Sequence, residues 1–252
     1  PNGAPSTVGL DAAYGGKVTG ASGNAYANAL TITGTNEPTA PHAERTITNA
    51  YGGAITNAAN AGAVGDQTGN ANRITVTGGV VTNAYGGYSA GTGAVSGNTA
   101  RIAGGQVTNA YGGQGTGNVR GNVAVLEGGS TGNVFGAAST GGDAASNHVI
   151  VRGGTAGSIY GAQTTSGNVS GNDVTITGGT VTGNVYAGGS TSGNVTDNTI
   201  SLGDETVRNL STAVVLGSAN LYGANTTAGT ASGNTLEVNA VAAAVNSVNA
   251  FD

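Results

Sequence analysis

The sequence contains no cysteine, which excludes disulfide bonds and thiolate metal sites. Charged residues make up only 8% of the chain, the net charge is -5 and no basic run occurs, so we expect no nucleic-acid partner. No apolar run approaches the roughly 20 residues of a membrane-spanning helix, and we expect no membrane insertion of this segment. No proline follows Pro41, as a continuous hydrogen-bonded stack of strands requires.

Glycine is abundant instead, with 49 of 252 residues, but it lacks the Gly-X-Y period of collagen. Residues 97–113 show the repeated pattern: Gly-Asn, an apolar alternation, Gly-Gly, a second apolar alternation, then Asn-Ala-Tyr-Gly-Gly. The closing aromatic residue recurs at intervals of 26, 24, 25 and 26 residues in the middle of the chain, which indicates a repeat architecture. The aromatic row comprises Tyr14, Tyr51, Tyr85, Tyr111, Phe135, Tyr160, Tyr186, Tyr222 and Phe251.

Three apolar rows recur in each copy and predict three short strands. The first row consists of pairs spaced by two, the period of a strand with one buried face. The second row directly precedes the aromatic residue, and the third lies three residues before a repeated asparagine. The first row comprises Ile74/Val76, Ala100/Ile102, Ala124/Leu126, Val149/Val151, Val174/Ile176 and Ile200/Leu202, and we expect these side chains to face inward.

A coil of this kind cannot bury its inner face alone, whereas stacked coils bury a continuous core and pair every backbone N–H and C=O. We therefore predict an all-β fold, a parallel β-solenoid (β-helix) of about eight coils of roughly 25 residues each. Residues 1–13 are expected to form an N-terminal lead-in and residues 14–252 a single body. Excursions are predicted at 35–45, which contains Pro38 and Pro41, and at 204–216, where charges gather.

Asparagine recurs at two positions of each copy and predicts two side-chain ladders. Asparagine tolerates the left-handed backbone of a corner, and its amide can join identical positions stacked about 4.8 Å apart. The first row comprises Asn28, Asn72, Asn98, Asn122, Asn147, Asn172, Asn198 and Asn234. The second row comprises Asn49, Asn83, Asn109, Asn133, Asn184, Asn220 and Asn249, with Ser158 as the exception. Ligand-binding asparagines are the less favoured alternative.

The aromatic row allows two interpretations. Stacked tyrosines could present a sugar-binding platform, or they could pack at a corner and wedge one face of the coil. Phe135 and Phe251 lack the hydroxyl group, which indicates that the hydroxyl is dispensable and favours the packed corner.

Residues 171–186, Gly-Asn-Asp-Val-Thr-Ile-Thr-Gly-Gly-Thr-Val-Thr-Gly-Asn-Val-Tyr, resemble the repeats of autotransporter (type V secretion) passenger domains and related Gly-Asn-rich surface adhesins of diderm bacteria. The resemblance covers nearly the whole chain from Tyr14 onward. It implies secretion, an extended β-solenoid stalk and a role in adhesion or surface coating. It also implies a receptor on a host or bacterial surface, whose identity it does not indicate.

Few residues are suited to catalysis. Asp173 and Asp197 lie in consecutive copies near equivalent corners, and converging carboxylates would suit a polysaccharide-cleaving β-helix, although solvated corner residues are the simpler interpretation. His42 and His148 have no nucleophile with an orienting acid nearby in sequence. The stretch 141–143, Gly-Gly-Asp, is a single and incomplete match to the Gly-Gly-x-Gly-x-Asp repeat that binds calcium. We therefore predict no catalytic residue, no cofactor and no metal site.

Thr-x-Thr triplets such as that at 175–177 also occur on the flat faces of ice-binding β-solenoids. Arg101, Glu127 and Arg152 interrupt the matching positions, and threonine is a good strand residue in its own right. Ice binding is therefore a less favoured alternative.

The sequence thus predicts a non-enzymatic, secreted structural or adhesive protein, either a stalk or a filament subunit, at the bacterial cell surface. A polysaccharide-binding or polysaccharide-cleaving β-helix is the competing interpretation. The chain starts at Pro1 without methionine and stops in mid-repeat after Phe251, so we expect a mature piece or a fragment. We also expect self-association end to end, in which the unfinished coil at 249–252 is continued by a second copy as a filament.

Overall fold

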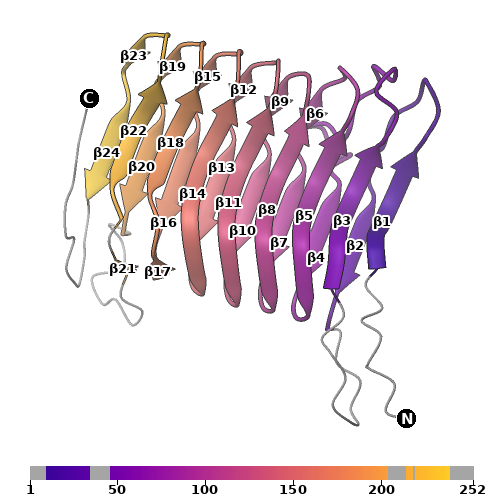
Figure 1. The fold of residues 1–252 in the computed structure, drawn as a ribbon, viewed down its shortest axis with the longest axis horizontal. Helices are drawn as coiled ribbons and strands as arrows, with labels where there is room; N and C mark the ends of the chain where they lie inside the picture. The colour runs from indigo at the N-terminus through magenta and orange to yellow at the C-terminus, as the bar shows by residue number, and fades with distance from the viewer. Residues whose placement is uncertain (1–9, 35–45, 204–213, 218, 239–252) are drawn as a thin grey trace, which may run out of the picture.

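The computed structural model describes residues 10–34, 46–203, 214–217 and 219–238, and in this part of the chain all regular structure is parallel β-strand. The strands form three sheets, and strands from consecutive coils lie side by side along the molecule (Figure 1). One of the sheets has eight strands, one from each coil. The predicted parallel β-solenoid and its number of coils are therefore confirmed.

The ten-stranded sheet contains β1 (Leu10–Val18), β3 (Thr46–Ile55), β5 (Val80–Ser89), β8 (Gln106–Gly115), β11 (Ser130–Ser139), β14 (Thr155–Thr164), β17 (Gly179–Val181), β18 (Val185–Ser190), β21 (Val214–Leu216) and β22 (Leu221–Thr226). The eight-stranded sheet contains β2 (Ala29–Ile32), β4 (Arg73–Val76), β7 (Thr99–Ile102), β10 (Val123–Leu126), β13 (His148–Val151), β16 (Asp173–Ile176), β20 (Thr199–Leu202) and β24 (Thr235–Val238). The six-stranded sheet contains β6 (Val95–Ser96), β9 (Val119–Arg120), β12 (Ala144–Ala145), β15 (Val169–Ser170), β19 (Val195–Thr196) and β23 (Ala231–Ser232).

Two of the predicted boundaries are wrong. The chain from Leu10 to Ala13 belongs to β1, where Leu10 pairs with Ile47, and is not part of a lead-in. Residues 214–216 form β21, which pairs with β17 and buries Val214 and Leu216, so they belong to the body and not to an excursion. Val214 and Leu216 join the body because they extend the core row of the neighbouring coil, whereas Leu10 is exposed and is held by its backbone pairing with β3. Residues 1–9, 35–45 and 204–213 lie outside the described residues.

The interior is divided into two hydrophobic cores. The larger core lies between the ten- and eight-stranded sheets and includes Ile102, Leu126 and Ile176, all fully buried. The smaller core lies between the ten- and six-stranded sheets and includes Val119 and Val169. The three predicted apolar rows therefore face inward through the regular coils. Each fully buried aliphatic side chain stabilises the fold by about 1.5–3 kcal/mol relative to its exposed state.

Glycine forms a narrow waist between the two cores. In β8, Gly112 and Gly113 follow Tyr111 directly. A Cβ atom on Gly112 would lie 2.8 Å from the backbone of Val123 in the facing wall, and one on Gly113 would lie 2.5 Å from the side-chain Cγ of Asn122. A side chain at either position would push the facing walls apart, so the repeated Gly-Gly reflects this close approach of the two walls.

Candidate functional site

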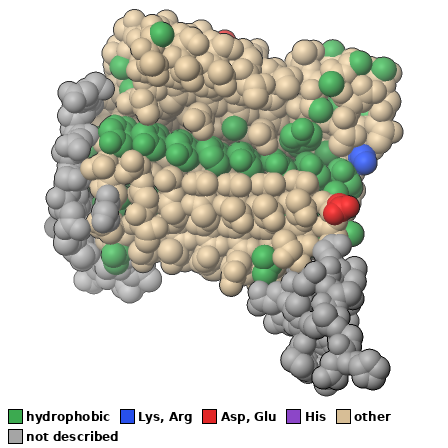
Figure 2. Space-filling view, viewed as in Figure 1, with side chains coloured by type: hydrophobic (Ala, Val, Ile, Leu, Met, Phe, Trp, Pro, Cys, Tyr) green, Lys and Arg blue, Asp and Glu red, His purple; other side chains and the backbone are tan. Residues whose placement is uncertain are grey.

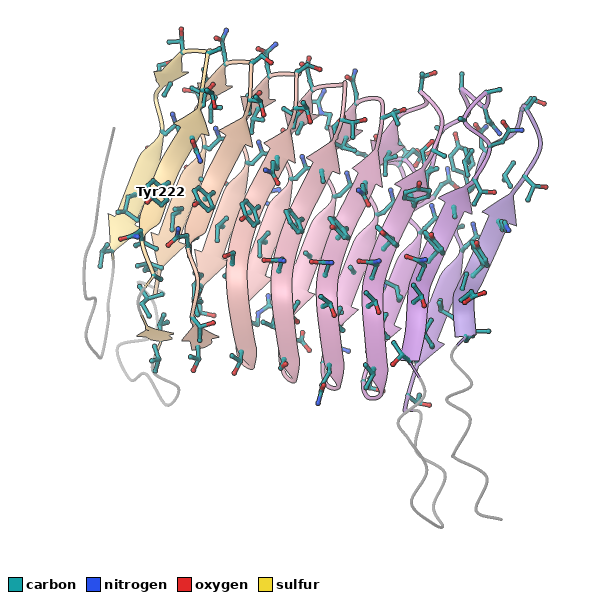
Figure 3. The ribbon with its side chains drawn as sticks, in the orientation of Figure 1. Tyr222 is labelled. Carbon is teal, nitrogen blue, oxygen red and sulfur yellow. The ribbon has the colours of Figure 1, made fainter. Side chains whose placement is uncertain are left out.

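The aromatic residues form one continuous stack on the outer surface of the solenoid. From Tyr14 to Tyr222, seven consecutive ring pairs have centroids 4.6–5.0 Å apart and ring planes within 7–11° of each other. Figure 3 shows the rings in one line across the strands, ending at the labelled Tyr222. The ring spacing equals the spacing of neighbouring strands, about 4.8 Å, because each ring occupies the same register position as the next.

The structure corrects the predicted location of this row. Tyr111 lies inside the ten-residue strand β8 and not at a corner. Tyr111 and Gly113 pair in register with the neighbouring coil, whereas Gly112 between them is skipped. The Gly-Gly pair therefore bends a continuous strand, because pairing with the neighbouring coils resumes directly after the bend. Phe251 lies outside the described residues.

The aromatic stack is partly covered. Tyr51 and Tyr85 are 8% exposed and Phe135 is 9% exposed, and the other described rings of the row are half-buried. Figure 2 shows a continuous hydrophobic band in a hollow that runs along this face of the molecule. Burial, with smaller contributions from neighbouring tyrosines, raises the pKa of Tyr51 to about 12. Burial is also the main cause of the raised pKa of Tyr85, and it raises the pKa of Tyr111.

This geometry bears on the two interpretations of the aromatic row. Each internal ring has both faces covered by its neighbours in the stack, so only ring edges and hydroxyl groups point outward. At one end of the stack, the Nζ atom of Lys17 lies 4.5 Å from the ring centroid of Tyr14. A sugar that stacks on an aromatic residue needs a free ring face. The arrangement therefore favours packing between coils over a sugar platform.

Inside the waist, the first asparagine row forms a buried ladder. The backbone N–H and the side-chain amide of Asn98 both donate to the Oδ1 atom of Asn122, at 3.0 Å each. Asn122 in turn donates from both groups to Oδ1 of Asn147, and its amide also donates to the carbonyl oxygen of Val95 at 2.9 Å. Asn98, Asn122 and Asn147 are fully buried. The same bonds connect Asn28, Asn72, Asn98, Asn122, Asn147, Asn172, Asn198 and Asn234.

Of the two predicted reasons for asparagine at this corner, the side-chain ladder is present, whereas the left-handed backbone is wrong. The left-handed residue precedes the asparagine and is Ser146 or Asp197 in two coils, with φ of 53° and 56°. Gly121 takes the same conformation in another coil, with φ of 63°. Asparagine occupies its position because its amide satisfies a buried backbone N–H and a buried carbonyl oxygen of the preceding coil and bonds to the asparagine side chain of the following coil.

The second asparagine row lies beside the aromatic stack and forms a ladder on both sides of an interruption at Ser158. Side-chain bonds of 2.9–3.0 Å join Asn49, Asn83, Asn109 and Asn133 in sequence. The next position holds Ser158, and further on the amide of Asn184 donates to the Tyr186 hydroxyl at 3.1 Å. On this later side, the backbone N–H and the side-chain amide of Asn220 donate to Oδ1 of Asn184 at 3.1 and 3.4 Å. Asn249 lies outside the described residues.

A row of hydroxyl groups also joins the coils and was not predicted. The Ser139 hydroxyl donates to the carbonyl oxygen of Gly117 in the preceding coil at 2.8 Å and accepts from the Gly142 N–H at 2.9 Å. The same pair of bonds is made by Thr164, Ser190 and Thr226. The spacing of serine or threonine three residues before glycine is the sequence signal that could have revealed this row.

The charged residues do not form the arrangement considered from the sequence. Asp173 and Asp197 are not register partners, because Asp173 pairs with Thr199, two residues beyond Asp197. Asp173 Oδ2 instead lies 3.2 Å from Nδ1 of His148, and this hydrogen bond raises the pKa of the histidine. His42 lies outside the described residues.

Arg101 forms an ion pair with Glu127, and Arg152 lies 3.7 Å from the same carboxylate. These side chains interrupt the Thr-x-Thr face, as the sequence indicated. No group of three or more His, Cys, Asp or Glu residues with the arrangement of a metal site occurs in the described part of the chain.

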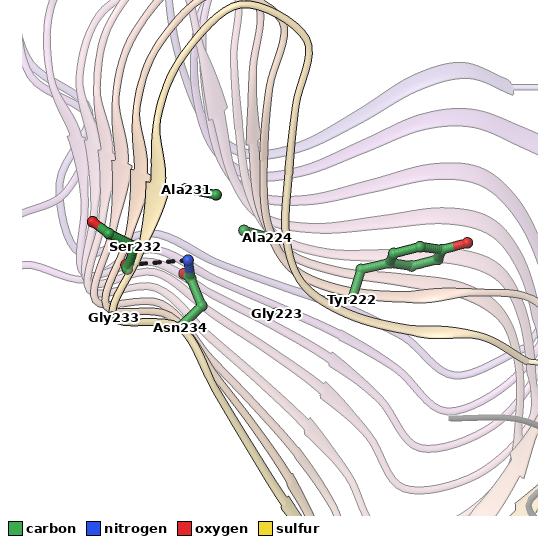
Figure 4. Close-up of a pocket in the computed structure, with 7 residues that line it drawn as sticks. All are labelled: Tyr222, Gly223, Ala224, Ala231, Ser232, Gly233 and Asn234. Carbon is green, nitrogen blue, oxygen red and sulfur yellow. Dashed lines mark hydrogen bonds between the residues drawn. The ribbon is translucent and has the colours of Figure 1, made fainter. Parts of the chain in front are cut away.

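A pocket of about 250 Å³ lies at the last described coil (Figure 4). Ala224 and Ala231 point toward each other inside the coil, and the amide of Asn234 donates to the Ser232 carbonyl oxygen at 3.2 Å. The Tyr222 ring lies on the other side of its strand. The lining residues are Tyr222, Gly223, Ala224, Ala231, Ser232, Gly233 and Asn234, none of them charged. The pocket is therefore the open end of the smaller core.

Comparison of the chain with models of protein families, with curated proteins and with solved structures found no match. Within the described ranges, no helix has the length and apolar character needed to cross a membrane.

Proposed function

We propose that this chain is part of a non-enzymatic, secreted β-solenoid stalk with a structural or adhesive role at the bacterial cell surface. The observation that supports the proposal is that the repeated polar and aromatic side chains contact the next coil. The buried asparagine row, the hydroxyl row and the stacked rings all run parallel to the axis. A stalk needs this property, because bending or stretching it requires neighbouring coils to separate.

Mechanical unfolding of the purified chain tests the stalk. We expect pulling from the two ends to remove coils stepwise at a force well above that needed for Asn122→Ala. Antibodies against the chain should also label intact, unpermeabilised cells of the source organism. Equal unfolding forces for the two proteins, or labelling only after permeabilisation, would contradict the proposal.

Polysaccharide binding is retained as the second candidate because Tyr160, Tyr186 and Tyr222 are half-buried. Figure 2 also shows a hydrophobic band in a hollow along this face of the molecule. Affinity electrophoresis through gels containing linear polysaccharides tests this candidate. Retardation that is lost in Tyr186→Ala would favour glycan binding over a purely structural role. Release of reducing ends from the same polysaccharides would instead favour a cleaving enzyme.

We also propose that copies of the chain associate end to end. Within the described residues, β1 and β22 pair on one side only, and both carry a Tyr-Gly pair of the aromatic row. Tyr14 could therefore extend the stack beyond Tyr222. Sedimentation of the purified chain over a range of concentrations should show assemblies that grow with concentration. A constant monomer mass would refute self-association. Residues 249–252, which were expected at this junction, lie outside the described residues.

A further inference from the structure

The tyrosine stack places like atoms of neighbouring rings close together along its whole length. The rings are nearly parallel and related by translation from coil to coil, so equivalent ring carbons are separated by roughly the centroid spacing, 4.8 Å for Tyr14–Tyr51 and 4.9 Å for Tyr51–Tyr85. The chain has no cysteine, so disulfides cannot join its coils. Side chains with the chemistry to form a covalent bond between coils are therefore concentrated in this row.

We propose that the tyrosine stack is a site of oxidative cross-linking, at which tyrosines of consecutive coils couple to dityrosine when the protein meets a one-electron oxidant. Each of two neighbouring phenols gives one electron to the oxidant and its hydroxyl proton to water. The two phenoxyl radicals then form a carbon–carbon bond between ring positions ortho to the oxygens. The ortho hydrogens move to the oxygens, which restores both phenols. The pair thus loses two electrons and two protons in total.

The order of residues in the stack determines which coils can be joined. Tyr51, Tyr85 and Tyr111 are consecutive and lie on one side of Phe135, whereas Tyr160 begins a second series on its other side. Phenylalanine has no hydroxyl proton to lose and does not form a phenoxyl radical. Phe135 therefore divides the stack into two cross-linkable series, and no bond forms across it.

The surroundings of the rings also favour coupling within the stack. Tyr111 and Tyr160 are half-buried, so an oxidant can reach them from solvent. The backbone pairing on both sides of each ring holds a radical beside its partner, whereas bulk solution would let it diffuse away. By contrast, Tyr26 is 38% exposed and lies outside the stack.

Brief illumination of the dilute, purified chain with tris(bipyridine)ruthenium and persulfate supplies the one-electron oxidant. Trypsin cleaves after lysine and arginine and places Tyr51, Tyr85 and Tyr111 in separate peptides, 46–73, 74–101 and 102–120. Mass spectrometry of the monomer fraction should find 46–73 joined to 74–101, and 74–101 joined to 102–120, each with the loss of two hydrogens. Fragment ions should place the bond in 74–101 on Tyr85 and not on Tyr88, whose tilted ring lies outside the stack. Cross-links that involve mainly Tyr26, or tyrosines that react only between molecules, would overturn the proposal.

Two variants with small structural changes sharpen the test. Tyr111→Phe should abolish the link between 74–101 and 102–120 while retaining the link between 46–73 and 74–101. Phe135→Tyr should create a link between 102–120 and 121–152 that the original chain cannot form. The native Phe135 shows that either residue fits the row, so both variants should fold. A link between 102–120 and 153–208 in the original chain, or no new link in Phe135→Tyr, would refute the assignment.

Cross-linking should also change the stability of the coils. A bond between neighbouring coils shortens the loops available to the unfolded chain, as other covalent links do. The oxidised monomer should therefore unfold at a higher temperature than the untreated chain, and the increase should be larger in Phe135→Tyr. If both cross-linked proteins melt at the same or a lower temperature than their untreated forms, coupling must have distorted the ring positions. That result would overturn the claim that the rings of the stack are already placed for coupling.

Discussion

Replacing Asn122 by alanine should remove the support of the waist at one coil. Three buried groups would lose their partners: the backbone N–H of Asn98, one amide N–H of the same residue, and the carbonyl oxygen of Val95. The Oδ1 atom of Asn147 would keep one donor, because the backbone N–H at position 122 remains. The substitution therefore affects hydrogen bonds in the two flanking coils as well as in its own.

The expected loss is large because water cannot reach these groups. An unsatisfied buried donor or acceptor costs about 1–3 kcal/mol, so three of them predict a decrease of about 3–9 kcal/mol in the free energy of unfolding. Asn133→Ala is the matched control. Asn133 is half-buried and donates one bond, to Asn109 at 2.9 Å, so its loss should cost only about 0.5–1.5 kcal/mol.

Urea denaturation followed by circular dichroism measures both values. The midpoint gives the change in stability, and an unchanged slope shows that the same surface unfolds in each variant. A smaller slope for Asn122→Ala would indicate that the coils separate into independently unfolding parts. A loss below about 1 kcal/mol, or one equal to that of Asn133→Ala, would refute the inference that the inner ladder supports the waist.

Other substitutions and conditions test further details. The buried Thr131 hydroxyl has no hydrogen-bond partner, so Thr131→Val should raise the free energy of unfolding by about 1–2 kcal/mol, and an unchanged urea midpoint would show that the hydroxyl is satisfied. Ser146→Gly should stabilise by about 0.5–1 kcal/mol by relieving a left-handed backbone, whereas a lower melting temperature would contradict this. Because burial raises the pKa of Tyr51 to about 12, stability should be full below its unfolded pKa of about 10 and fall as the pH rises toward 12. Tyr51→Phe should reduce that fall in urea midpoints measured across this range.

The periodic features of the fold could be predicted from the sequence. The spacing of Val174 and Ile176 identifies a strand with one buried face, and its recurrence identifies the coil. A fixed period also requires that identical residues stack, so the asparagine and aromatic rows follow without knowledge of the coil's cross-section. These predictions succeeded because they depend on the order of residues along the chain and on strand geometry.

The shape of the cross-section could not be predicted in the same way. A Gly-Gly pair such as Gly112 and Gly113 is typical of a turn, yet these residues form a bend within β8. Whether glycine ends a strand depends on pairing with other coils, which the sequence does not show. The contact of His148 with Asp173 likewise depends on register, because the two residues are 25 positions apart in sequence. The division into two cores was also missed, since the apolar rows indicate burial but not which wall each side chain meets.

The first asparagine ladder and the aromatic row have a common role at the waist. Gly112 and Gly113 carry no side chains, so the waist has no hydrophobic packing of its own. On its inner side, Asn122 bonds to neighbouring coils, and on its outer side the Tyr111 ring covers the bend. Hydrogen bonds contribute more when water is excluded, and the ring stack keeps water from the outer surface of this thin wall. The aromatic row therefore stabilises the asparagine ladder from the other side of the wall. Covering the wall requires an aromatic ring but no hydroxyl group, which explains why Phe135 occupies the row as well as tyrosine.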